Sequence, residues 1–255
     1  MIGSIAGDII GSTFEVRPVK SKDFPLFAPG SRFTDDSVLT VAVARAILEN
    51  EDYRDHVHAL GWRYPDAGYG ARFIGWLQEA DPQPYGSWGN GAAMRVSPVG
   101  FAFADVDTVL AEAARSAAIS HDHPEGIKGA QAVALAVFLA RTTGDREVIR
   151  EELTRRFGYD LDRCLADIRP GYGFDVSCQG SVPEAIISFL EADSWEDAVR
   201  NAVSLGGDAD TQACIAGGIA EAYFGVPEVI RTQAEARLPP DLLDTVHAFR
   251  RRFLE

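Results

Sequence analysis

Apolar residues recur at helical spacing along almost the whole of this 255-residue chain, and this periodicity decides the fold class. In segment 36–49, for example, Val38, Val41 and Ala42 are separated by three and four positions, which is typical of an amphipathic helix that begins at an acidic turn. Segment 123–141 is apolar on nearly all faces after Pro124, which predicts a buried central helix. Further helices are expected at 181–191, 195–204, 208–223 and 239–253. No alternating strand pattern longer than four residues is present, so we expect an all-α protein.

The connecting segments indicate one domain. Gly and Pro gather at 61–70, 81–91 and 169–183, and each of these stretches is short enough to be a loop inside a domain. The chain has no low-complexity run and no visible internal repeat. We therefore expect residues 1–255 to form a single compact domain of roughly ten or more helices.

Composition limits the possible partners. The formal net charge of −14 disfavours charge-driven nucleic-acid binding, although a bound metal ion can still attract a small anion to one site. Three scattered cysteines predict reduced and mostly buried thiols. The N-terminal segment is acidic at Asp8 and does not resemble a signal peptide, and no window reaches the ~18 apolar residues needed to span a bilayer. The expectation is a cytoplasmic protein without membrane contact, and a monomer.

Two predicted helix starts carry carboxylates and a threonine hydroxyl. The first is Thr34-Asp35-Asp36, and the second is Asp208-Ala209-Asp210-Thr211, which follows two glycines. Each alone has an ordinary explanation, because Asp is a good N-cap and is stabilised at the positive end of the helix dipole. Taken together they form an oxygen-only set, which selects Mg²⁺, Mn²⁺ or Ca²⁺ over zinc. Four carboxylates suit two divalent ions better than one.

Five blocks of the chain resemble the ADP-ribosylglycohydrolase family, which includes the dinitrogenase-reductase-activating glycohydrolase and the human ADP-ribosyl-acceptor hydrolases. The blocks stand in the family's order and read GDIIGSTFE (7–15), FTDDSVLT (33–40), GSWGNGAAMRVS (86–97), SHDHPE (120–125) and GGDADT (206–211). The resemblance implies an all-α fold with two Mg²⁺ or Mn²⁺ ions in a cleft, where ADP-ribose lies over the metals. It implies six metal ligands: Thr34, Asp35, Asp36, Asp208, Asp210 and Thr211.

The resemblance also implies a substrate-binding set in the middle of the chain. The family contacts the diphosphate at the glycine-rich loop, and it has a histidine near the ligand at the position of His121. The implied residues are Gly86, Ser87, Trp88, Gly89, Asn90, Gly91, Met94 and His121. Without the resemblance this loop signal is weak, because Gly, Ser and Asn mark any turn. Trp88 is equally well explained as a partly buried anchor of the loop, and His123 as a helix cap.

Glu15 matches a family glutamate that approaches the metals on a mobile loop, and segment 16–33 could be that loop here. Glu15 can also be explained as an ordinary surface residue at the end of the first helix. Asp8 is better explained as a structural hydrogen-bonding group. The expected reaction is hydrolysis at the anomeric carbon of an ADP-ribosyl group, releasing ADP-ribose, with Glu15, Asp35 or Asp36 as general base. A metal-bound carboxylate is a poor base, which favours Glu15.

Two alternatives to this reaction remain. One is a two-metal hydrolase of another ribosyl or phosphoryl substrate. The other is an ADP-ribose-binding or immunity-type protein without turnover. The acceptor linkage stays open.

Overall fold

A computed structural model describes all 255 residues, and it confirms the all-α prediction. Regular structure consists of fifteen helices, and the only strand-like pairing is an isolated antiparallel bridge between Gly89 and Ser177. The helices are α1 (Ile2–Gly11), α2 (Asp35–Glu49), α3 (Tyr53–Arg63), α4 (Ala71–Gln78), α5 (Gly91–Met94), α6 (Ser97–Ala102), α7 (Val106–Ala118), α8 (Pro124–Thr143), α9 (Arg146–Phe157), α10 (Leu165–Ile168), α11 (Cys178–Leu190), α12 (Trp195–Val203), α13 (Ala209–Phe224), α14 (Glu228–Glu235) and α15 (Pro240–Phe253).

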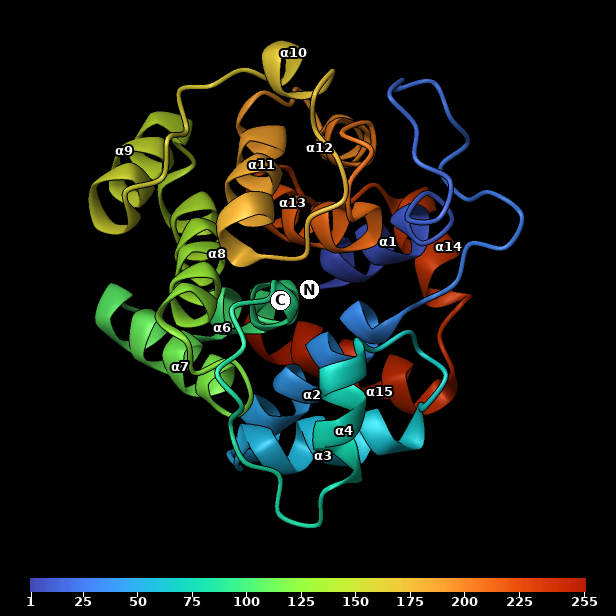
Figure 1. The fold of residues 1–255 in the computed structure, drawn as a ribbon, viewed down its shortest axis with the longest axis vertical. Coiled ribbons are helices and arrows are strands. Elements are labelled where there is room, and N and C mark those ends of the chain that lie inside the picture. Colours follow the sequence, from blue (N-terminus) through green and yellow to red (C-terminus); the bar gives the residue numbers. More distant parts are fainter.

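The helices form two groups. In Figure 1, α8, α9, α11, α12 and α13 lie in the upper part of the molecule, and α2, α3, α4 and α15 lie in the lower part. Helix α1 packs along α13 and also contacts α2, so it joins the two groups. A single hydrophobic core runs through both groups. None of the helices combines the length and the apolar character needed to cross a bilayer.

Glycines on α1 allow a close backbone contact with α13. A Cβ atom added at Gly3, Gly7 or Gly11 would lie 2.1–2.5 Å from backbone carbonyl oxygens of α13. The three glycines recur every fourth residue and therefore share one face of the helix. Because this face carries no side chains, the α1 and α13 backbones touch, and the C-terminal end of α1 lies against the first residue of α13, Ala209.

The predicted helices occur, with small shifts in their ends. The segment predicted as a central helix is α8, whose residues 132–140 are all buried, and His123 caps it by accepting a hydrogen bond from the amide of Glu125. The prediction of a helix start at Ser181 is wrong: α11 begins at Cys178 and contains Pro183. Its cap is Ser177, whose hydroxyl accepts from the amide of Gly180, so the Ser-Val-Pro sequence lies inside the helix.

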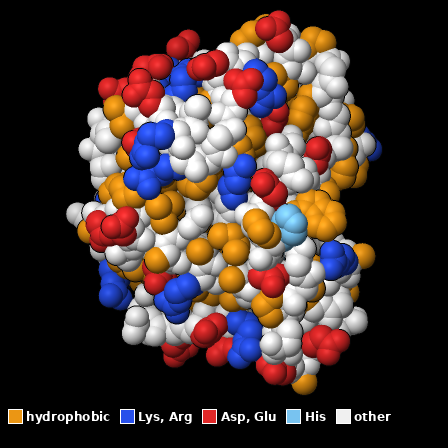
Figure 2. Space-filling model, turned by 60° about the vertical axis from the view of Figure 1, so that its left-hand side comes forward, with side chains coloured by type: hydrophobic (Ala, Val, Ile, Leu, Met, Phe, Trp, Pro, Cys, Tyr) orange, Lys and Arg blue, Asp and Glu red, His pale blue; other side chains and the backbone are white.

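The surface carries charges of both signs. On the face drawn in Figure 2, Asp and Glu side chains are interspersed with Lys and Arg, and no continuous basic stripe appears there. All three cysteines are free thiols, two of them buried, as predicted.

Candidate active site

A cleft of about 460 Å³ lies between the two helix groups. Its walls come from the N-terminal ends of α2 and α13, the loop after α1, residues 67–73, the glycine-rich loop with α5, and His121. Of the predicted site residues, the lining includes Glu15, Thr34, Asp35, Asp36, Ser87, Gly89, Asn90, Gly91, Met94, His121, Asp208, Asp210 and Thr211. A second cavity, of about 560 Å³ and lined in part by Tyr53 and Arg115, contains none of them.

Asp8 fixes the start of α2. Its Oδ2 accepts hydrogen bonds from the amides of Thr34 (2.9 Å) and Ser37 (3.1 Å) and from the Ser37 hydroxyl, and its Oδ1 accepts from the Thr34 hydroxyl at 2.6 Å. Thr34 in turn caps the helix by accepting from the amide of Asp36. The fully buried carboxylate of Asp8 therefore organises the first turn of α2, as the sequence indicated for a structural group.

Two overlapping groups of carboxylates converge at the base of the cleft. One consists of Asp8, Asp36 and Asp210, and the other of Glu15, Asp208 and Asp210, with one oxygen from each residue within 4.8 Å of the others in its group. Asp210 belongs to both groups. Asp35 lines the cleft but belongs to neither.

The hydrogen bonds around these carboxylates leave ligand positions open. Oδ1 of Asp36 is buried and has no hydrogen-bond partner. Asp208 accepts from the side-chain amide of Asn90 at 2.8 Å, and the Thr211 hydroxyl lies 3.4 Å from Oδ2 of Asp36. A buried carboxylate oxygen without a donor is unfavourable unless a cation neutralises it. The side chains present therefore fit divalent cations.

Burial and mutual repulsion strongly shift the pKa values of these acids. Burial, with the neighbouring carboxylates, raises the pKa of Asp36 and Asp210 well above the usual range and that of Asp35 to about 8. The pKa of Asp208 is raised mainly by burial. Burial and the charges of Asp208 and Asp8 raise the pKa of Glu15 as well. Without a cation, part of this group would bind protons near neutral pH.

The glycine-rich loop is only partly directed at the cleft. The amide of Gly86 donates to Asp122 at 2.6 Å, and Gly86 does not line the cleft. Trp88 is 48% exposed and packs edge-on against His123, outside the cleft. Asn90 is buried, and its side chain donates to Asp208 and to the Ser181 hydroxyl. The loop therefore supports the acidic group as well as lining the cleft.

Met94 and His121 are buried at the cleft. The sulfur of Met94 lies 3.9 Å from the Thr211 hydroxyl, at the start of α13. His121 is 5% exposed, and burial together with the charges of Arg95 and Arg72 lowers its pKa well below the usual range. Its ring is therefore neutral.

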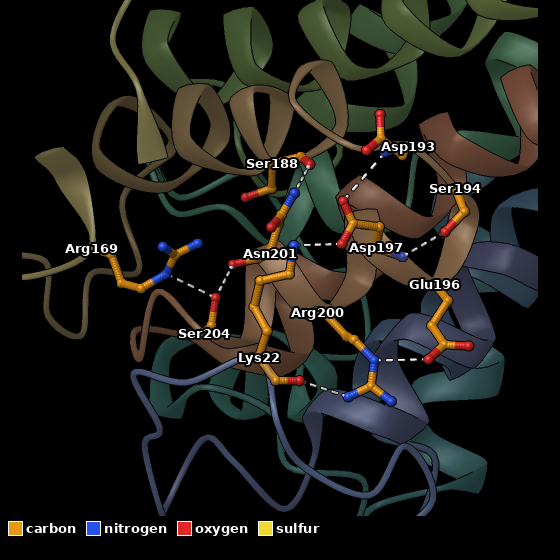
Figure 3. Close-up of polar contacts among 10 residues, drawn as sticks. All are labelled: Lys22, Arg169, Ser188, Asp193, Ser194, Glu196, Asp197, Arg200, Asn201 and Ser204. Carbon is orange, nitrogen blue, oxygen red and sulfur yellow. Dashed lines mark hydrogen bonds and ion pairs between the residues drawn. The ribbon is translucent and has the colours of Figure 1, made fainter. Parts of the chain in front are cut away.

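The loop that carries Glu15 is held against α12 near its middle. The guanidinium of Arg200 donates to the backbone carbonyls of Lys22 (2.7 Å) and Phe24 (2.8 Å), and the Lys22 ammonium pairs with Asp197. Figure 3 shows the contacts of Lys22 with Arg200 and with Asp197, together with Glu196, which accepts from Arg200 on the same helix. On the other side of the loop, Lys20 donates to three backbone carbonyls. Glu15 itself lies in a turn beyond the end of α1, which stops at Gly11.

The sequence patterns did not identify several residues that line the cleft. Arg32 and Arg72 add cations to the lining, and the Arg72 guanidinium lies 4.8 Å from the centre of the Tyr85 ring. Arg95 is fully buried behind His121. Nothing in the local sequence separates these arginines from surface residues.

A model of the ADP-ribosylglycohydrolase family matches residues 1–254. The chain belongs to this family. Its human relative ADP-ribosylhydrolase ARH3 is 28% identical, over 95% of this chain and 90% of the relative. ADP-ribosylarginine hydrolase Tri1 of Pseudomonas putida is 23% identical, over 96% of this chain and 72% of the relative.

A solved structure titled ADP-ribosylglycohydrolase-related protein complex shares the fold, with a TM-score of 0.72 and 22% identity over 98% of this chain and 96% of its own. Family membership confirms the prediction of a hydrolase that acts on ADP-ribosyl groups.

Proposed function

We propose that this hydrolase releases ADP-ribose from an ADP-ribosylated acceptor, and that it uses two divalent cations, Mg²⁺ or Mn²⁺, held at the base of the cleft. The observation that supports this proposal is the convergence of two carboxylate groups that share Asp210, with one buried oxygen of Asp36 left without a donor. The ligands would be Thr34, Asp35, Asp36, Asp208, Asp210 and Thr211. When bound, the cations supply positive charge that can bind ribose hydroxyls and polarise a water molecule.

Glu15 is the proposed general base. It is only partly buried, and it lies on a loop rather than on a helix. Its raised pKa makes it a better proton acceptor near neutral pH than an ordinary glutamate. It is also the member of its carboxylate group that can move away from a cation without disturbing a helix start. Asp35 and Asp36 are the remaining candidates, and Asp35, outside both converging groups, is the freer of the two.

The rest of the cleft would hold the ADP-ribosyl group. Ser87, Gly89 and Gly91, with His121, form the side proposed for the diphosphate, and Arg32 and Arg72 add positive charge at the lining. Phe174 is 62% exposed and lines the cleft with Val176, which gives an apolar surface suited to an adenine ring. As the bond between the anomeric carbon and the acceptor breaks, the nearby carboxylates would stabilise the positive charge of an oxocarbenium-like centre.

The test is a panel of substrates in which ADP-ribose is linked to arginine, serine, a nucleic-acid base or a small molecule. Each is assayed with Mg²⁺, with Mn²⁺ and after chelation, and products are identified by mass spectrometry. We expect free ADP-ribose from at least one linkage, only with metal. Release of inorganic phosphate instead, or full turnover by metal-free protein, would contradict the proposal.

A further inference from the structure

A line of hydrogen bonds runs from Arg95 through Ser120 to His121. Nη2 of Arg95 donates to the hydroxyl oxygen of Ser120 at 3.1 Å and to the backbone carbonyl of Ser116 at 2.9 Å. The same Ser120 oxygen lies 2.8 Å from Nδ1 of His121. Arg95 and Ser120 are both fully buried. A guanidinium can only donate, so Ser120 must accept from Arg95.

This geometry decides where the proton of the neutral His121 ring resides. Ser120 has one hydroxyl hydrogen, and its oxygen has only two side-chain partners, Arg95 and His121. If Nδ1 carried the proton and donated to Ser120, the hydroxyl hydrogen would be left buried without an acceptor, which is costly. If the hydroxyl donates to Nδ1, the hydroxyl hydrogen of Ser120 and the lone pair of Nδ1 are both satisfied. The second arrangement places the ring proton on Nε2.

Nε2 faces the glycine-rich loop. A Cβ atom added at Gly91 would lie 3.0 Å from Nε2, and one added at Gly89 would lie 3.6 Å from it. Nδ1 is occupied by Ser120, whereas Nε2 has no hydrogen-bond partner within the chain. Tyr85 packs against the other side of the ring, with ring centroids 5.9 Å apart. The Nε2 hydrogen is thus free to meet a ligand in the cleft.

We propose that Ser120, held by Arg95, is a positioning residue that fixes His121 with its ring proton on Nε2. In this state Nε2 of His121 donates a hydrogen bond to an anionic phosphate oxygen bound beside Gly89 and Gly91. The nature of that ligand rests on the function proposed above, whereas the position of the proton does not. The arrangement suits an anion because the donor is in place before the ligand arrives and needs no protonation step.

The first measurement locates the ring proton of His121 in the parent protein. Two-bond ¹H–¹⁵N correlation spectra of the ligand-free protein report which nitrogen of each neutral histidine carries the proton. The chain has five histidines, and His121→Ala assigns the signal of interest by its disappearance. We expect the His121 proton on Nε2. A proton on Nδ1 would overturn the inference and leave the proposed function untouched.

The second measurement asks whether Ser120 acts through His121. Ser120→Ala removes the hydroxyl that contacts the ring, and Ser116→Ala is the matched control, because it removes a buried hydroxyl without a partner and keeps the carbonyl that Arg95 uses. We expect Ser120→Ala to change the ¹⁵N chemical shifts of the His121 ring and to raise the Kd for ADP-ribose about threefold to tenfold. His121→Ala should raise this Kd about tenfold to hundredfold. Ser116→Ala should leave both readouts near those of the parent.

A double-mutant cycle completes the test. In the His121→Ala background, Ser120→Ala should cause no further loss of ADP-ribose affinity, because its effect is carried by the ring. Additive losses, or unchanged His121 shifts in Ser120→Ala, would overturn the positioning role. If ADP-ribose binds without shifting the His121 signals, the donor role fails together with the proposed ligand placement, even if the proton is found on Nε2.

Discussion

Removing divalent metal should make the stability of this protein fall as pH rises. The acids at the base of the cleft have raised pKa values in the folded chain, with Asp35 at about 8 and Asp8 at about 6, against 3.8 for an ordinary aspartate. A carboxyl group with a raised folded pKa binds a proton more tightly in the folded state than in the unfolded state. Its stabilising effect is therefore complete below the unfolded pKa and is lost as pH rises toward the folded pKa.

The size of the effect follows from the shift of Asp35. A change from 3.8 to about 8 is roughly four pKa units, and each unit is about 1.4 kcal/mol, so an isolated group would lose up to about 5–6 kcal/mol. The acids share protons, and Asp35 retains some solvent contact, so about half of this is a reasonable expectation. Over pH 5 to 8 we expect a loss of about 2–3 kcal/mol, or about 5–10 °C in Tm for a chain of this size.

Thermal unfolding, followed by circular dichroism at pH 5, 6, 7 and 8, measures this slope. Chelator-treated protein should lose Tm steadily across the range, and protein with excess Mg²⁺ should not, because the cations keep the carboxylates ionised without penalty. Asp36→Asn, which removes one repelling charge, should flatten the slope of the metal-free protein. A Tm that is constant or rises with pH in the metal-free protein would refute the electrostatic account of the cleft.

Three substitutions test individual roles. Asp208→Ala should weaken metal binding in calorimetric titrations and lower turnover by several orders of magnitude, and parental metal affinity would rule out the ligand assignment. Glu15→Gln should bind ADP-ribose nearly as well as the parent but lose on the order of 10²–10⁴ in single-turnover rate; parental turnover would move the general base to Asp35 or Asp36. Gly91→Ala places a Cβ atom 3.0 Å from the His121 ring, so it should weaken ADP-ribose binding measurably while metal affinity stays near parental.

Local patterns were enough to predict α2, α8, α12, α13 and α15, with two helix starts that carry acidic residues. The helix starts at Thr34 and Asp208 could be predicted because the capping residue and the carboxylates are neighbours in sequence. The start of α11 was misplaced because Ser181 and Pro183 are ordinary helix-start residues, and only packing in the folded chain reveals that the helix begins at Cys178.

Contacts between distant segments could not be predicted in the same way. Asp8 belongs to a converging carboxylate group, whereas Asp35 lies outside both groups. This difference depends on how α1 and α13 pack against α2. Arg95 occupies a stretch of sequence that would suit an exposed residue equally well, and its full burial follows from the packing of α5 against α7 and α8. The family resemblance gave six consecutive loop residues, yet Gly86 and Trp88 do not line the cleft.

Metal stoichiometry tests the dinuclear site most directly. Asp210 belongs to both carboxylate groups, so it is the one residue whose change should affect both cations. Metal-free protein titrated with Mn²⁺ and followed by electron paramagnetic resonance should bind two ions per chain that are magnetically coupled, and Asp210→Asn should abolish the coupled signal while the helical circular dichroism persists. A single uncoupled ion in the parent, or an unchanged coupled pair in Asp210→Asn, would contradict the two-cation site.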